Sequence, residues 1–108
     1  MYTVVCTMEA SSAVEWDEKK NRRNLAKHRV GFDIAARVFD DPYALTIPDL
    51  HEDEQRWLTT GLVKGVPLLV VHTWGEEDYE QIVRIISVRK ATPSEVRAYE
   101  RERGKTTG

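Results

Sequence analysis

Four segments with β-strand patterns follow one another along this chain, and they constrain its fold more than any other feature. Apolar and β-branched residues dominate each segment, and proline or glycine stands in the turns between them. The four ranges are 43–47, 54–63, 66–73 and 79–89. Because a parallel pair needs a long crossover, strands joined by such short connections must be antiparallel neighbours. The sequence therefore predicts a four-stranded antiparallel sheet.

Helical patterns lie on both sides of these strands. Residues 17–28 begin with an N-cap aspartate and then contain no glycine, proline or β-branched residue. A shorter helix is predicted within residues 32–39, where apolar residues recur at helical spacing. A capping box of Thr, Pro and Glu within residues 92–95 opens a last helix, expected over 93–103. We expect an α+β fold with two N-terminal helices, the four-stranded antiparallel sheet and a C-terminal helix.

The length of 108 residues fits one domain. We predict an N-terminal extension over residues 1–13, a single domain over 14–103 and a frayed tail over 104–108. The one cysteine, Cys6, excludes an internal disulfide. The chain has no apolar run long enough to cross a bilayer, and its first residues lack the features of a signal peptide. We therefore expect a cytoplasmic protein without membrane contact.

Charged residues are segregated along the sequence, although the formal net charge is only −2. Basic residues cluster between residues 19 and 29, and acidic residues gather at 49–54 and 76–80. A segregated surface of this kind suits a protein that binds a polyanion on one side. The alternative is two faces that are simply solvated.

The predicted helix over residues 17–28 lacks the broad apolar stripe of a helix that packs on a sheet. At about 100° per residue, Lys20, Asn24, Lys27 and His28 fall on one side of it. All four side chains can contact phosphate. A solvated basic face is the alternative, but the repulsion between so many cations favours an anionic ligand.

Charged residues also occupy the predicted strands. Glu54 and Arg56 share one face of their strand. Arg84 lies inside an apolar segment and needs a partner or a pocket, for which Glu54 is the expected carboxylate; a structural ion pair between strands is the alternative. Arg89 ends the same segment, and strict alternation places it opposite to Arg84 unless a β-bulge intervenes.

The remaining motifs exclude most enzyme classes. His72 alternates with apolar residues and is expected to be a buried histidine of the sheet, and His51 lies in an acidic loop. Histidine and carboxylate spacings match no known metal site, so we expect no metal and no cofactor. The sequence has no glycine-rich phosphate loop, no serine nucleophile elbow and no cysteine pair.

The charged groups that remain can support RNA cleavage without a metal. A base removes the proton of the ribose 2′-OH, the oxygen attacks the adjacent phosphorus, and an acid protonates the leaving oxygen. Glu54 or His28 could be the base, whereas Lys27, Arg56 and Arg84 could hold the phosphate and stabilise its developing charge.

Several motifs in the same order carry a resemblance to a known family. They are VEWDEKKNRRNLAKHRVGFDIAARVFDDP over residues 14–42, Glu54-Gln55-Arg56, RIISVRKAT over residues 84–92, and Tyr99. The pattern resembles the BrnT toxin family over residues 14–100, with Lys27-His28-Arg29 where that family has Lys-His-Gly.

The resemblance implies a RelE-like fold and a type II toxin that arrests translation as an endoribonuclease. It also implies a BrnA-like antitoxin with a ribbon-helix-helix segment, through which alone the complex would bind operator DNA. We assign catalysis to Glu54, Arg56, Arg84, His28 and Lys27, and further RNA contacts to Lys20, Asn24 and Arg89. The alternative is a non-catalytic or degenerate module of this fold that binds an antitoxin or nucleic acid.

Overall fold

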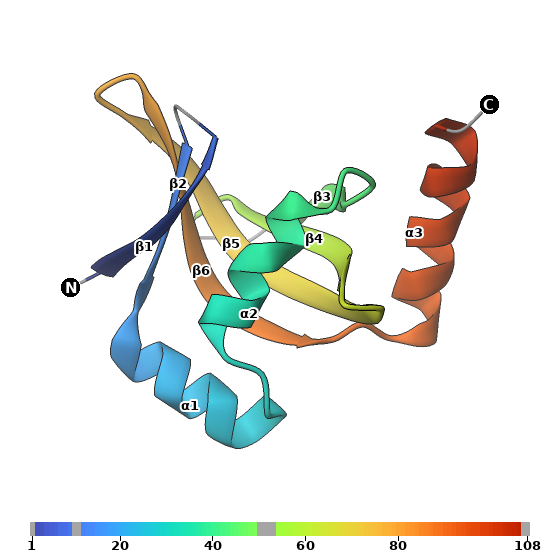
Figure 1. Cartoon of the computed structure of the whole chain (residues 1–108), viewed down its shortest axis with the longest axis horizontal. Helices are drawn as coiled ribbons and strands as arrows, with labels where there is room; N and C mark the ends of the chain where they lie inside the picture. The colour runs from blue at the N-terminus through green and yellow to red at the C-terminus, as the bar shows by residue number, and fades with distance from the viewer. Residues whose placement is uncertain (1, 10–11, 50–53, 107–108) are drawn as a thin grey trace.

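The computed structural model describes residues 2–9, 12–49 and 54–106 of the chain. Over these residues six strands form one sheet in the order β1–β2–β6–β5–β4–β3, and three α-helices and a 3₁₀ helix accompany it (Figure 1). The strands are β1 (Tyr2–Glu9), β2 (Ser12–Asp17), β3 (Leu45–Asp49), β4 (Arg56–Val63), β5 (Val66–Glu77) and β6 (Glu80–Lys90). The helices are α1 (Glu18–His28), α2 (Phe32–Ala36), η1 (Arg37–Asp40) and α3 (Pro93–Thr106).

The predicted RelE-like layout is wrong. It had two N-terminal helices, a four-stranded antiparallel sheet and a C-terminal helix. Two strands precede α1, and β2 pairs in parallel with β6, so the α+β fold has a mixed sheet. The physical reason lies in Val14 and Trp16, which alternate along β2 and are buried in the core. The long connection from β2 to β6 permits the parallel pairing. The predicted division at residue 13 into an extension and a domain stays a prediction.

The later strands pair as their short connections require. β3 with β4, β4 with β5, and β5 with β6 are all antiparallel. The β4–β5 turn places Lys64 at φ 50° and Gly65 at φ 81°, and a hairpin turn with two positive φ values matches the twist of its strands.

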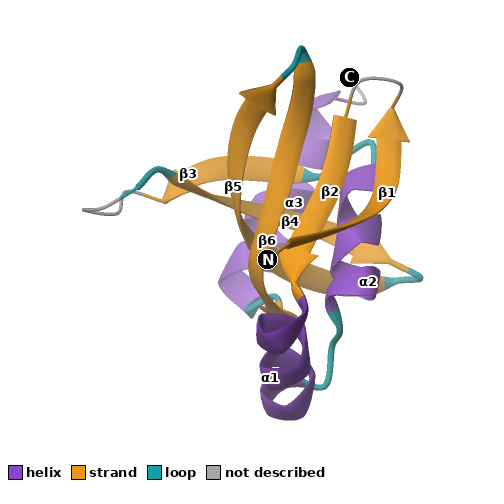
Figure 2. Ribbon diagram, turned by 90° about the vertical axis from the view of Figure 1, so that its left-hand side faces the viewer, coloured by secondary structure: helices purple, strands orange, loops and turns teal. Residues whose placement is uncertain are grey.

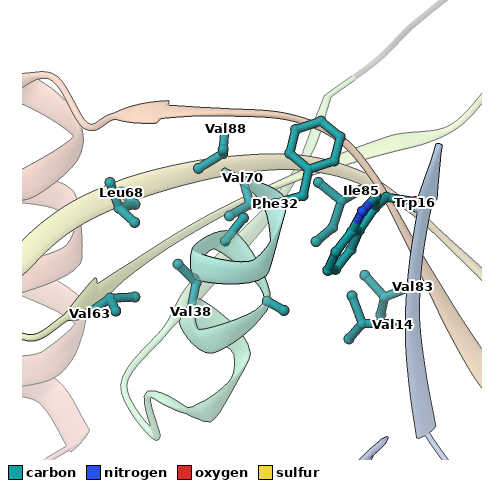
Figure 3. Packing of buried hydrophobic residues seen from close by; sticks show 12 residues of the cluster. Val14, Trp16, Phe32, Val38, Val63, Leu68, Val70, Val83, Ile85 and Val88 are labelled. Atoms are coloured by element: carbon teal, nitrogen blue, oxygen red, sulfur yellow. The ribbon is translucent and has the colours of Figure 1, made fainter. Parts of the chain in front are cut away.

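The hydrophobic core lies between one face of the sheet and the α2–η1 segment, which crosses that face (Figures 1 and 3). The ring of Phe32 meets Trp16 edge to face, with 6.1 Å between the ring centroids. Gly61 of β4 lies where a Cβ atom would be 2.9 Å from Cγ1 of Val38. The absence of a side chain at residue 61 therefore lets η1 approach the sheet closely.

A β-bulge in β6 decides which side chains share the other face of the sheet. Val71 pairs with Ser87 and His72 with Ile85, so Ile86 is the extra residue. Because Ile85 and Val88 both belong to the core, Arg84 and Arg89 both point to the opposite side. We call the side of the sheet opposite to the core the outer face. Figure 2 shows α2 on one side of the sheet and α1 beyond the ends of the strands.

Asp41 joins α3 to the sheet. Its Oδ2 atom accepts hydrogen bonds from the backbone N–H of Leu62 at 2.9 Å and from the hydroxyl of Tyr99 at 2.7 Å. Burial raises the pKa of Asp41, but the hydrogen bonds outweigh it and keep that pKa below its usual value. Burial and the Asp41 hydrogen bond together raise the pKa of Tyr99 to about 12. None of the described helices combines the length and hydrophobicity needed to cross a bilayer.

Candidate functional site

The side chain of Asn24 hydrogen-bonds helix α1 to β6. Asn24, only 7% exposed, donates from Nδ2 to the carbonyl oxygens of Val30 at 2.9 Å and Val88 at 2.8 Å. Its Oδ1 atom accepts from the N–H of Val88 at 3.1 Å. These hydrogen bonds explain how a helix without an apolar stripe is fixed to the sheet. They also use both polar atoms of Asn24 at the junction between the helix and the strand, although the sequence analysis predicts an RNA contact for this residue.

One flank of α1 borders a basic hollow of about 380 Å³. We call it the α1 pocket, and its lining residues are Lys20, Arg23, Asn24, Lys27, His28, Ile86 and Ser87. It brings together three cationic side chains and one imidazole, and none of these described lining residues is acidic. Such a set of donors fits a phosphate group. Four of the predicted residues therefore meet here: Lys20, Lys27, His28 and Asn24, whose amide is engaged by Val30 and Val88.

Arg23 belongs to the α1 pocket but was not predicted. It lies three residues after Lys20 and four before Lys27, so the helical spacing already placed it on the same flank. The signal was present, because residues three and four apart are neighbours on a helix surface. The predicted arc of Lys20, Asn24, Lys27 and His28 leaves Arg23 out.

A second hollow, of about 340 Å³, lies near the β5–β6 hairpin. We call it the hairpin pocket, and its lining residues are Glu54, Gln55, Thr73, Trp74, Gly75, Glu76, Ile82 and Arg84. Nε of Arg56 contacts Oε1 of Glu54 at 3.3 Å, a pair that the sequence analysis did not predict. Glu54, Arg56 and Arg84 are therefore gathered at or beside this pocket.

Arg84 pairs with Glu15, a residue that sequence reasoning did not single out. Nε of Arg84 donates to Oε1 of Glu15 at 2.5 Å, because the parallel register sets these two residues opposite each other on β6 and β2. The expected partner, Glu54, contacts Arg56 instead. Glu15 could be found only by recognising β2 as a strand. The Arg84 side chain remains 44% exposed.

The two pockets are neighbours on the outer face of the sheet. Ile82 and Arg84 line the hairpin pocket, and Ile86 and Ser87 line the α1 pocket, all from β6. Alternate residues on one strand face are about 7 Å apart, so the linings adjoin and the sheet does not separate them. Apart from Arg56, which contacts Glu54 beside the hairpin pocket, and Arg89, the predicted site residues thus line two adjacent pockets and not one.

Arg89 stabilises the start of α3 through Glu95. Its guanidinium makes two hydrogen bonds to the carboxylate of Glu95, at 2.8 and 2.9 Å, and Glu95 also accepts from the N–H of Thr92 at 2.8 Å. The hydrogen bond to Glu95 raises the pKa of Arg89, and the same bond lowers that of Glu95. Arg89 shares the outer face with Arg84 because of the bulge, but it is not among the residues that line either pocket.

His72 is a buried structural histidine, as predicted. Its Nδ1 atom lies 3.2 Å from the carbonyl oxygen of Thr73, which can only accept, so Nδ1 carries the proton. Burial lowers the pKa of His72 to about 4, so the ring is neutral at pH 7 and Nε2 accepts from the hydroxyl of Thr59 at 2.7 Å. Thr59 in turn accepts from the hydroxyl of Thr46 at 2.8 Å. This chain of hydrogen bonds satisfies every polar group that it contains.

The described residues contain no group of three or more histidine, cysteine or acidic side chains placed to hold a metal ion. His51 and the acidic residues beside it, Glu52 and Asp53, lie outside the described residues.

Comparison with known proteins gives one result that covers most of the chain. No curated protein matches. A family model, that of the ribonuclease toxin BrnT of type II toxin–antitoxin systems, matches residues 16–95. The matched range begins within β2 and ends in the first turn of α3, so it includes α1, the whole of β6 and the residues that line both pockets. The chain therefore belongs to the BrnT family of ribonuclease toxins.

Proposed function

We propose that this chain is a metal-independent endoribonuclease that cleaves a single RNA strand on the outer face of the sheet, between α1 and the β5–β6 hairpin. The α1 pocket carries the proposal, because three cations and an imidazole gather there without an acidic neighbour in the lining. A site of this kind binds a phosphodiester and can also transfer a proton beside it.

The proposed reaction needs only side chains of this protein. His28 takes the proton of the 2′-OH, the oxygen forms a bond to phosphorus, and the bond to the 5′ oxygen breaks. A protonated group supplies the proton for that leaving oxygen, so the products are a 2′,3′-cyclic phosphate and a 5′-hydroxyl. Lys20, Arg23 and Lys27 stabilise the charge that develops on the phosphate oxygens.

The hairpin pocket holds the neighbouring nucleotide in this proposal. Arg84 is exposed at its edge and contacts the next phosphate, while the Glu54–Arg56 pair borders the same nucleotide. Glu54 is the second candidate for proton transfer, since its carboxylate is half exposed beside this pocket. Asn24 acts as a positioning residue, because its hydrogen bonds fix the helix that carries the cations.

A type II family implies an antitoxin partner. We propose that this partner is BrnA-like, that its ribbon-helix-helix segment binds operator DNA for the complex, and that the free toxin acts on RNA in the cytoplasm.

A non-catalytic binding module is the second candidate. It is favoured by the ion pairs of the strand arginines, since Arg56, Arg84 and Arg89 each contact a carboxylate. Arginines held in this way could serve the fold alone.

Cleavage of a mixed-sequence single-stranded RNA by the purified chain, with EDTA present, separates the two candidates. We expect cyclic phosphate ends, a loss of about 100-fold for His28→Gln and at least about tenfold for Lys27→Ala. Arg22→Ala, which removes one charge from an exposed position of α1 outside the pocket, is the matched control and keeps full activity. RNA left intact by a folded protein that still binds its antitoxin would establish the second candidate.

A further inference from the structure

The opposite flank of α1 borders a third hollow, which is mostly apolar. We call it the α1–β5 groove; its volume is about 570 Å³, and α1, α2, the β4–β5 turn and the end of β6 contribute to it. Leu25, Ile34 and Val66 are apolar lining residues. Leu25 is 50% exposed and Val66 42% exposed, although both are large hydrophobic residues. Exposed apolar side chains that gather around one hollow are typical of a binding surface.

The rim of the α1–β5 groove is basic. Arg29 is the C-cap residue of α1, Lys64 lies in the β4–β5 turn and Lys90 ends β6, and all three line the groove. Asp33 is the one acidic residue among the described lining residues. An apolar floor with a basic rim fits a protein segment that inserts apolar side chains and presents carboxylates beside them. A nucleic acid would find few polar partners on this floor.

Two of the rim cations stand at backbone positions that favour glycine. Arg29 has φ 63° and Lys64 has φ 50°, both in the left-handed region. Neither side chain is needed for these turns, since glycine adopts the same conformation without strain. Their charges therefore lie at the rim for a reason other than the local fold.

We propose that the α1–β5 groove is the docking site of the antitoxin, which would insert apolar side chains among Leu25, Ile34 and Val66 and place acidic residues against Arg29, Lys64 and Lys90. The proposal rests on the toxin role proposed above. It also suggests how inhibition works. The groove and the α1 pocket lie on two flanks of one helix about 10 Å across, so a partner seated in the groove needs to extend only that far to cover the pocket.

The test measures binding of a purified BrnA-like antitoxin to purified full-length variants of the toxin. Arg29→Gly and Lys64→Gly each remove a rim charge and relieve backbone strain, so both variants should fold, and their melting temperatures are measured beside the Kd. We expect each to raise the Kd at least about tenfold, with a weaker dependence on salt, while RNA cleavage is unchanged. Leu25→Ser should raise the Kd to a similar extent. Arg101→Ala, which removes an exposed cation from α3, is the matched control and should not change the Kd.

The other outcomes overturn the proposal. An unchanged Kd in all three groove variants, with a raised Kd in Lys20→Ala or Arg23→Ala, would place the antitoxin over the α1 pocket. Weaker binding of 2′-O-methyl RNA to Arg29→Gly and Lys64→Gly would make the groove an RNA site. The docking proposal and the nuclease proposal can fail independently, because a wild type that cleaves no RNA can still bind the antitoxin through the groove.

Discussion

The side chain of Asn24 and the backbone of Val88, 64 residues apart in sequence, exchange hydrogen bonds in both directions. The amide of Asn24 thus bonds to the edge of β6 in the way that the backbone of a neighbouring strand would. Because α1 buries little apolar surface, this exchange and the bond to Val30 position the cations of the α1 pocket.

Replacement of Asn24 by Ala should lower the free energy of unfolding by about 2–3 kcal/mol, since the N–H and C=O of Val88 would remain buried without partners. Urea denaturation followed by circular dichroism measures this loss. Arg22→Ala, in the same helix, should change the free energy of unfolding by less than about 0.5 kcal/mol. An equally small effect of Asn24→Ala would mean that other contacts hold α1.

Replacement of Arg29 by Gly should stabilise the protein by about 1 kcal/mol, because Arg29 holds a left-handed conformation that costs a residue with a Cβ atom this much. Thermal unfolding measures the change. The contrasting variant is Arg22→Gly, which should lose about 1 kcal/mol inside the helix. A lower melting temperature for Arg29→Gly would show that the arginine side chain supports the fold.

The buried His72 should make the stability depend on pH. Its pKa is about 4 in the folded chain and about 6.5 when unfolded, so the unfolded chain binds more protons between these values. The free energy of unfolding is therefore full above pH 6.5 and falls by about 3 kcal/mol as the pH drops to 4.

A His72→Gln variant should be less stable at pH 7 and should lack that part of the pH dependence. Chemical denaturation of both proteins from pH 4 to pH 8 gives the comparison. Parallel curves for the two proteins would contradict the burial of a neutral imidazole at this position.

Glu15 should oppose RNA binding while it supports the fold. Its carboxylate pairs with Arg84 and reduces the positive potential at the edge of the hairpin pocket. Glu15→Gln should tighten binding of a 2′-O-methyl RNA about two- to fivefold and should lower the melting temperature. Fluorescence anisotropy measures the affinity, with Glu100→Gln on the exposed side of α3 as the control. Weaker RNA binding by Glu15→Gln would show that Glu15 positions Arg84 for the phosphate.

Local patterns in the sequence predicted most of the single elements. The spacing of residues 17–28 and the capping box at 92–95 predicted α1 and the start of α3, because capping and helical periodicity depend only on neighbouring residues. The pairing of β2 with β6 joins segments about 70 residues apart, and no local pattern encodes it. Because β2 was not predicted as a strand, both the predicted sheet and the predicted partner of Arg84 were wrong.

The candidate site was predictable where its residues share one helix. Lys20, Lys27 and His28 meet in the α1 pocket because helical spacing alone sets them on one flank. The common face of Arg84 and Arg89 depends on the bulge at Ile86, which alternation could not reveal. The contacts of Asn24 with Val88 were likewise beyond local reasoning, so its amide was assigned to RNA.

The salt dependence of RNA binding tests most directly whether one strand occupies both pockets. In a plot of log Kd against log salt for a 2′-O-methyl RNA, loss of one phosphate contact lowers the slope by about 0.7. We predict that decrease for Lys27→Ala and for Arg84→Ala, about twice as much for the double variant, and none for Arg22→Ala. Slopes for Lys27→Ala and Arg84→Ala equal to that of the wild type would contradict a shared RNA site on the outer face.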